Sequence, residues 1–190
     1  MAKAMAVEWD AQDEKVDPQT MPVTRSANAA IDKVAVQHAE VADLVGAYGA
    51  HDLLCYRAEI PTGLQKRQAQ AWDPVLEWAA GALGVQFNIT TGLVYKDQPP
   101  EAMMRLRNLV FERDAFNLTA LHDLVCLSGS LIIGLATCHQ AFEVEDLWNR
   151  ARVDEVWQAE QWGHDAEAQA TEADKRSAFL QVNQFLKSLF

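Results

Sequence analysis

The sequence predicts a mainly α-helical protein, a multihelical bundle with at most a short β hairpin. A chain of 190 residues with only 9 glycines and 6 prolines, and with abundant alanine, glutamine, glutamate and leucine, favours helices. Its hydrophobic content of 49% is enough for one substantial core. We therefore expect residues 1–190 to form a single helical domain, with a division into two lobes near residues 90–100 as the alternative.

Three helices are predicted in the first half of the chain. Residues 2–13 form a short amphipathic helix that ends before two X-Pro pairs. A long helix follows from Thr24 to Ala47, because branched apolar residues recur there at helical spacing. Residues 64–81 form a helix interrupted at Asp73-Pro74, where Asp73 caps the second part and Pro74 occupies its first turn.

Two short segments have extended character. Residues 51–59, HDLLCYRAE, form either a short strand or a buried linker that stops before Pro61. Residues 85–95, VQFNITTGLVY, are β-branched and aromatic and are bounded by turn residues, which predicts a two-stranded hairpin at most.

The second half of the chain is predicted to be helical. One helix runs from Pro100 to about Arg113, and the next begins near Asn117 and reaches His139 or Gln140. Its nearly uniform apolar part, Leu124–Cys138, is shorter than the ~20 residues of a membrane-spanning helix, so we expect a central buried helix. Ser130 and Gly134 would let another helix approach it closely. Another helix begins at Glu143, and an amphipathic one over Asp174–Leu189 closes the chain.

The segment Asp154–Gly163, DEVWQAEQWG, has the most unusual composition in the chain. At about 100° per residue, an arc of roughly 80° on one helix face contains Trp148, Ala151, Glu155, Ala159 and Trp162. Burying a carboxylate on such a face costs several kcal/mol unless a partner offsets it. Either Arg152 pairs with Glu155, or Glu155 is held for function. Val153 and Trp157 lie on the opposite face, so we expect this helix to be buried between layers.

Charge and cysteine usage exclude several classes of protein. With 16 Lys+Arg against 27 Asp+Glu, the formal net charge of −11 disfavours nucleic acid and anionic membrane as partners and would attract a basic protein surface. The three cysteines, Cys55, Cys126 and Cys138, form no CxxC pair and are expected to be small buried hydrophobes in a reducing compartment. Residues 1–15 contain acidic residues and no long apolar run, so we do not expect this stretch to be a secretory signal.

No convincing active site is found in the sequence. No histidine follows a glutamate at the spacing of a di-metal bundle, and HExxH is absent. Glu160, His164 and Glu167 could share a helix face and hold a metal ion, although a solvated helix end is the better interpretation because Gly163 precedes the histidine. We expect no cofactor, and we interpret Trp9, Trp72, Asp73 and Pro74 as structural.

Seven segments, in this order along the chain, closely resemble the Atp-twelve family: EWDAQ (8–12), TMPVTRSANAAID (20–32), HDLLCYRAE (51–59), WDPVLEWA (72–79), LTAL (118–121), GSLIIGLA (129–136) and DEVWQAEQWG (154–163). The resemblance implies a non-enzymatic assembly chaperone for the F-one sector, the catalytic head of ATP synthase. Such a chaperone binds the unassembled α subunit and prevents its self-association until the β subunit replaces it. The family's sheet-rich N-terminal segment is expected to be absent here.

The resemblance also implies site residues. The glutamate essential for assembly corresponds to Glu155, with Asp154 as the neighbouring possibility, and Trp157 and Trp162 are expected to contact the partner. From helical spacing alone, Arg152 is interpreted as structural, and its pairing with Glu155 remains the alternative to a partner-binding role of Glu155. We expect a monomer when free, in the bacterial cytoplasm, or in the mitochondrial matrix if the source is eukaryotic. The alternatives are a helical metal-dependent enzyme and a regulatory domain with a small ligand between Trp148 and Trp162.

Overall fold

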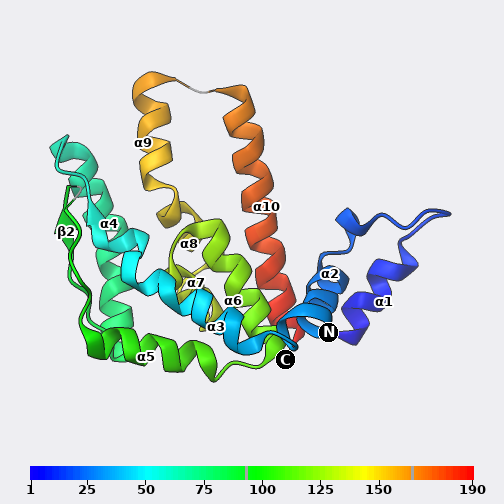
Figure 1. The fold of residues 1–190 in the computed structure, drawn as a ribbon. Helices are drawn as coiled ribbons and strands as arrows, with labels where there is room; N and C mark the ends of the chain where they lie inside the picture. Colours follow the sequence, from blue (N-terminus) through cyan, green and yellow to red (C-terminus); the bar gives the residue numbers. More distant parts are fainter. Residues whose placement is uncertain (93, 164) are drawn as a thin grey trace.

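The computed structural model describes residues 1–92, 94–163 and 165–190, and it confirms the mainly α-helical class (Figure 1). Ten α-helices and one two-stranded sheet are formed by the described residues. Their bounds are α1 Ala2–Asp10, α2 Pro22–Ala29, α3 His38–Ala47, β1 Tyr56–Arg57, α4 Thr62–Trp78, β2 Thr90–Thr91, α5 Pro100–Phe111, α6 Ala115–Ser128, α7 Leu131–Cys138, α8 Val144–Ala151, α9 Val153–Trp162 and α10 Ala166–Ser188. None of the helices in this described part is both long and apolar enough to cross a membrane.

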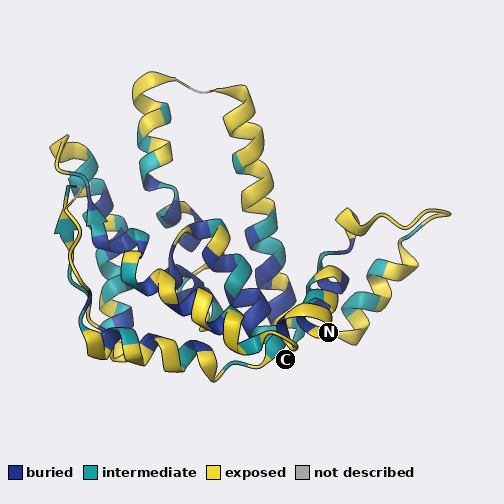
Figure 2. Ribbon diagram, in the orientation of Figure 1, coloured by how far each residue is buried: buried dark blue, intermediate teal, exposed yellow. Residues whose placement is uncertain are grey.

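Helices α6 and α7 form the centre of the protein. They contact each other, and α2, α3, α4, α8 and α10 pack around them. Figure 2 shows the buried residues concentrated in this region. Side chains with 0% exposure supply the core here: Leu118, Leu121, Leu124, Leu131, Ile132, Ile133 and Leu135. Because each buried leucine or isoleucine contributes ~1.5–3 kcal/mol relative to exposure, this cluster is a major source of stability.

The central helix predicted over Leu124–Cys138 is divided in two, so the prediction of one continuous helix is wrong. Gly129 adopts a φ of 74°, in the left-handed region that ends helices, and Ser130 caps α7 by accepting a hydrogen bond from the Ile133 amide at 3.0 Å. The predicted close approach is present at Gly134, where a Cβ would lie 3.0 Å from Leu121 and Val125 of α6.

A buried carboxylate completes the break between α6 and α7. Asp52 is 0% exposed and accepts hydrogen bonds from the Ser130 hydroxyl (2.8 Å) and the Ile132 amide (3.1 Å) at the start of α7. It also accepts one from the Leu54 amide at 3.0 Å. Burial raises the pKa of Asp52 to about 6, although these donors oppose the shift. A residue far away in the sequence therefore satisfies amides that a helix start leaves free.

The helix predicted over Thr24–Ala47 is also divided. The Glu8 carboxylate of α1 accepts two hydrogen bonds from amides in the first turn of α2, at 2.7 and 2.8 Å. The chain then continues through a π-helical turn, Ala30–Val34, and leaves the helix at Gln37 before α3 begins. This change of direction lets α3 pack on both α5 and α6, and it is set by packing rather than by any helix-breaking residue.

Helix α4 runs without interruption through Pro74, so the predicted break and the N-cap role of Asp73 are wrong. A proline inside a helix leaves a carbonyl one turn earlier without its amide. The carbonyl that Pro74 leaves free is that of Gln70, and the Arg150 guanidinium of α8 donates a hydrogen bond to the neighbouring Ala71 carbonyl. Asp73 instead pairs with Arg57, with Nη2 and Oδ1 2.7 Å apart.

The short strand predicted in residues 51–59 is present as β1, but the hairpin predicted in residues 85–95 is not formed by the described residues of that segment. β2 pairs in parallel with β1, with Tyr56 opposite Thr90. A parallel pair joins two segments distant in sequence, which local pattern does not reveal. Residue 93, which falls within the predicted hairpin, is outside the described residues.

Candidate functional site

The predicted face of the acidic, tryptophan-containing segment is divided between two helices. α8 ends and α9 begins on either side of Arg152, whose φ of −114° and ψ of 16° interrupt the helix. Trp148 of α8 is 2% exposed and packs on Phe179, with ring centroids 5.3 Å apart. Trp162, at the end of α9, is 79% exposed. The predicted common face is therefore wrong, because the break turns α9 away from the core.

Glu155 is exposed, contrary to the prediction that it lies on a buried face. Its side chain is 54% exposed and forms the predicted ion pair with Arg152, with Oε1 and Nη1 3.0 Å apart. The Arg152 side chain is only 11% exposed, lies over the Trp148 ring at 4.9 Å and donates to the Ser128 carbonyl at 3.2 Å. Arg152 thus holds the Glu155 carboxylate against the edge of the core.

The other face of α9 is attached to α4. Gln68 is 2% exposed and joins two segments: its Nε2 donates to Asp154 at 2.7 Å, and its Oε1 accepts from the Ala58 amide at 2.7 Å. The preceding residue, Arg67, donates two hydrogen bonds to Glu160, at 2.9 and 2.8 Å. Asp154 therefore orients α9 from within the fold, whereas Glu155 faces outward.

Trp157 fills the remaining contact between these two helices. The Arg67 guanidinium lies 5.0 Å from its ring centroid. A Cβ at Gly63 would lie only 2.7 Å from Trp157 Cη2, so the indole rests directly on the backbone of α4. Trp157 is half-buried and attaches α9 to α4, so its position gives it a structural role in holding these two helices together.

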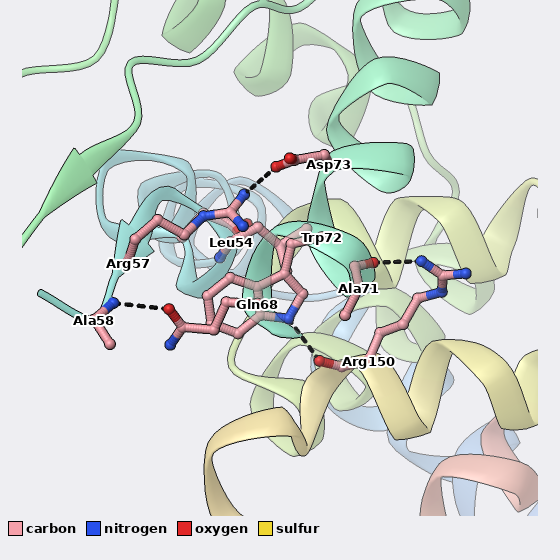
Figure 3. Close-up of polar contacts among 9 residues, drawn as sticks. Leu54, Arg57, Ala58, Gln68, Ala71, Trp72, Asp73 and Arg150 are labelled. Atoms are coloured by element: carbon pink, nitrogen blue, oxygen red, sulfur yellow. Dashed lines mark hydrogen bonds and ion pairs between the residues drawn. The ribbon is translucent and has the colours of Figure 1, made fainter. Parts of the chain in front are cut away.

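A polar network in turn fixes α4 relative to α8 and β1 (Figure 3). The buried Trp72 indole donates to the Arg150 carbonyl at 2.7 Å, and Arg150 donates back to the Ala71 carbonyl. Arg57 of β1 lies 5.0 Å from the Trp72 ring centroid and pairs with Asp73. Burial lowers the pKa of Arg57, and the Asp73 carboxylate opposes that shift. This network makes α4 a fixed support for α9.

Helices α9 and α10 extend beyond the core (Figures 1 and 2). Residues of these two helices and of the segment between them line a cleft of about 1210 Å³. Five carboxylates and three cations line it, together with apolar side chains. The acids are Glu155, Glu160, Asp165, Glu167 and Glu172, the bases are Arg152, Lys175 and Arg176, and the larger apolar residues are Val156 and Trp162. An exposed tryptophan between carboxylates is suited to a partner surface that is apolar with basic groups.

Glu172 of α10 interacts across the cleft with the charges of Arg152 and Glu155 on the α9 side. Burial raises its pKa, the Arg152 guanidinium opposes the shift and the Glu155 carboxylate adds to it. Arg176, one turn further along α10, pairs with Glu145 of α8 at 2.7 Å. The base of the cleft is therefore held by charged contacts to α8, while its outer part is open.

The structure gives little support to the alternative sites. No group of three potential metal ligands occurs among the described residues, and His164, part of the predicted set, lies outside them. Trp148 is absent from the cleft lining, so Trp148 and Trp162 do not enclose a common ligand. Trp9 is 51% exposed on α1, which contradicts its expected packing. Cys126 is exposed rather than buried.

Sequence reasoning missed the residues of α4 that position the site. Gly63, Arg67 and Gln68 lie far from α9 in sequence, with separations of 93 residues for Arg67–Glu160 and 86 for Gln68–Asp154. Each is an ordinary residue of an amphipathic helix, so no local pattern marks it. The one available signal was Gln68, a glutamine on the side of the predicted helix that Leu64 and Trp72 make apolar.

Known proteins resemble this chain over nearly its full length. The model of the ATP12 chaperone protein family matches residues 1–80. The crystal structure of Atp12 from Paracoccus denitrificans is 46% identical, with a TM-score of 0.95, and the match covers 98% of this chain and 80% of that one. A mutant of that protein with an aspartate changed to lysine is 45% identical, with a TM-score of 0.96 and the same coverage. A protein from Agrobacterium tumefaciens, described as a chaperone, is 39% identical, with a TM-score of 0.94, and the match covers 100% of this chain and 71% of that one.

Proposed function

This chain belongs to the ATP12 chaperone family of ATP synthase assembly, and from that premise we propose that it binds the unassembled α subunit of the F-one sector. The cleft between α9 and α10 is the proposed binding surface. The bound chaperone covers a surface through which α subunits would self-associate, and the β subunit later replaces it. This role requires no cofactor and no catalytic step.

The observation that carries the proposal is the exposed tryptophan in an acidic cleft. Trp162 leaves 79% of its surface exposed and Val156 leaves 47%, and both line the cleft. Exposed apolar surface of this kind marks binding sites, because leaving it in water is unfavourable without a partner. Aromatic side chains are also enriched among the residues that dominate binding free energy.

Charge adds selectivity to this surface. Carboxylates outnumber cations around the cleft, and the whole chain has a net charge of −11. A client surface with basic groups around an apolar centre would be attracted to it, and repulsion would disfavour nucleic acid and anionic lipid. We infer that Glu155 contacts the client directly, while Asp154 acts by holding α9 on α4 through Gln68.

The proposal is tested by binding of purified chaperone to unassembled α subunit, with light scattering of the α subunit as the readout of aggregation. Trp162→Ser should weaken binding by ~2 kcal/mol or more, which is about thirtyfold in Kd, as expected for an aromatic hot spot. Trp9→Ser is the matched control, because it removes an exposed tryptophan on α1. If both variants bind the α subunit with equal affinity, the cleft is not the binding surface. If the wild-type protein forms no complex with the α subunit, the α subunit is not its client.

Glu155→Lys tests the role of charge. Reversal should abolish binding and leave the melting temperature little changed, because the Glu155 side chain is 54% exposed. Glu112→Lys makes the same charge change at the C-terminal end of α5, outside the cleft, and should bind normally. If Glu155→Lys unfolds the protein, the carboxylate is structural rather than a recognition group.

A further inference from the structure

A second group of chemically active side chains lies on α6, outside the cleft. His122 and Cys126 are one helical turn apart, with Nε2 and Sγ separated by 3.7 Å. Asp123 accepts a hydrogen bond from His122 Nδ1 at 2.9 Å. A thiol facing an imidazole whose other nitrogen is held by a carboxylate is the arrangement that activates cysteine nucleophiles.

The surroundings of Cys126 favour its thiolate. The hydrogen bond from His122 lowers the pKa of Cys126 most, burial opposes this, and the Tyr48 hydroxyl lowers it further. The charge of Asp123 raises the pKa of Cys126. Hydrogen bonds with Asp123 and with Cys126 itself raise the pKa of His122 to about 10, against the effect of burial, so a protonated imidazole and a thiolate stabilise each other at neutral pH. Tyr48, His122 and Asp123 are the groups whose ionisation affects this thiol.

The other two cysteines provide a contrast within the same chain. Cys55 is buried and Cys138 is half-buried, whereas Cys126 is exposed. Burial raises the pKa of both Cys55 and Cys138. Only a thiolate that reagents can reach reacts with electrophiles at a useful rate. Cys126 is therefore the one cysteine of the three that combines access with an activating neighbour.

We propose that Cys126 is a modification site for low-molecular-weight disulfides such as oxidised glutathione. The Cys126 thiolate attacks one sulfur of the disulfide, a new S–S bond forms, and the original S–S bond breaks. The departing thiolate takes a proton from the His122 imidazolium, which then regains one from water. No external oxidant is needed, because one disulfide replaces another. The site is independent of the α9–α10 cleft, whose lining does not include Cys126.

Iodoacetamide labelling of the whole protein, followed by peptide mass spectrometry, tests the activation. An ordinary cysteine with a pKa near 8.5 loses about fifteenfold in rate between pH 8.5 and 7, because its thiolate fraction falls. Between the same two pH values native Cys126 should lose clearly less in rate than the ordinary cysteine, and it should react well before Cys55 and Cys138. The urea-unfolded protein provides the ordinary profile for the same three peptides. A native profile that matches the unfolded one would refute the activation.

His122→Gln separates the effect of the imidazole from that of exposure. The variant should restore the steep pH profile at Cys126, and an unchanged profile would show that His122 does not activate the thiol. Incubation with oxidised glutathione should then give one mixed disulfide per chain in the wild type, reversed by dithiothreitol and absent from Cys126→Ser. Modification at Cys55 or Cys138 instead would overturn the proposal. If His122→Gln does not fold, the comparison of native and unfolded wild type still decides the question.

Discussion

Replacing Asp52 by asparagine should change how the stability of the protein depends on pH. In the folded protein this carboxyl is 0% exposed, and its pKa is raised from 3.8 to about 6 because burial disfavours the charged form. Between these two values the folded state binds more protons than the unfolded state. The free energy of unfolding therefore falls as pH rises through this window, which is opposite to the usual behaviour of a salt-bridged carboxylate.

The magnitude follows from the shift. A change of one pKa unit corresponds to about 1.4 kcal/mol, so the full cost above pH 6 is ~3 kcal/mol. Part of this free-energy cost is already present at pH 4, because the Asp52 carboxyl of the unfolded protein is about half-ionised at that pH. The loss expected between pH 4 and pH 7 is therefore about 2.5 kcal/mol. Asparagine retains an acceptor for the Leu54 amide and the Ser130 hydroxyl but has no charge to bury.

The assay is urea unfolding of the wild type and Asp52→Asn at pH 4, 5, 6 and 7. The difference in free energy of unfolding, wild type minus variant, should fall by about 2.5 kcal/mol across this series. Subtraction removes the contributions of other titrating groups, which the two proteins share. A difference that is constant with pH, or that rises toward pH 7, would show that Asp52 is not the buried, destabilised carboxylate described above.

Two further predictions concern the attachment of α9 to α4. Gln68→Leu removes the donor to Asp154 and the acceptor of the Ala58 amide, and should cost ~1–3 kcal/mol in urea unfolding; a neutral result would mean that this amide does not hold α9. Gly63→Ala would place a Cβ 2.7 Å from Trp157 Cη2, so it should displace the indole and shift the tryptophan fluorescence to longer wavelength. This is expected even though alanine ordinarily favours a helix over glycine by ~1 kcal/mol. Gly81→Ala, where no atom lies within 4 Å of the new Cβ, is the matched control and should leave the spectrum unchanged.

Local signals in the sequence identified many elements correctly. The last helix was predicted to be amphipathic over Asp174–Leu189, and α10 buries Phe179, Val182, Phe185 and Leu186 there, although it begins earlier, at Ala166. The expected end of α9 at Gly163 is also observed, with a φ of 93° that suits glycine. The pairing of Arg152 with Glu155 was predictable too, because side chains three positions apart meet on one helix. Each of these properties depends on residues within a turn or two of one another.

Helix breaks were harder to predict because the groups that stabilise them are distant in sequence. Asp52 accepts a hydrogen bond from the Ile132 amide at the start of α7, and the Glu8 carboxylate accepts two from amides at the start of α2. A break in a buried helix is stable only if a partner satisfies the backbone groups that the break leaves free. Whether such a partner is present depends on how the helices pack, so residue propensity alone placed the boundaries incorrectly.

In the candidate site, too, some features could be predicted from neighbouring residues and others depend on how the helices pack. The sequence alone determined a mainly helical, acidic chain and marked the segment 154–163, because composition and periodicity are properties of neighbouring residues. Only the tertiary structure decided that Glu155 and Trp162 face a cleft while Asp154 and Trp157 are held on α4. The turn at Arg152 and the contacts of Gly63 and Gln68 set that orientation. The helical periodicity of the sequence cannot specify the orientation of α9, because the direction of a helix relative to the core depends on the surface against which it packs.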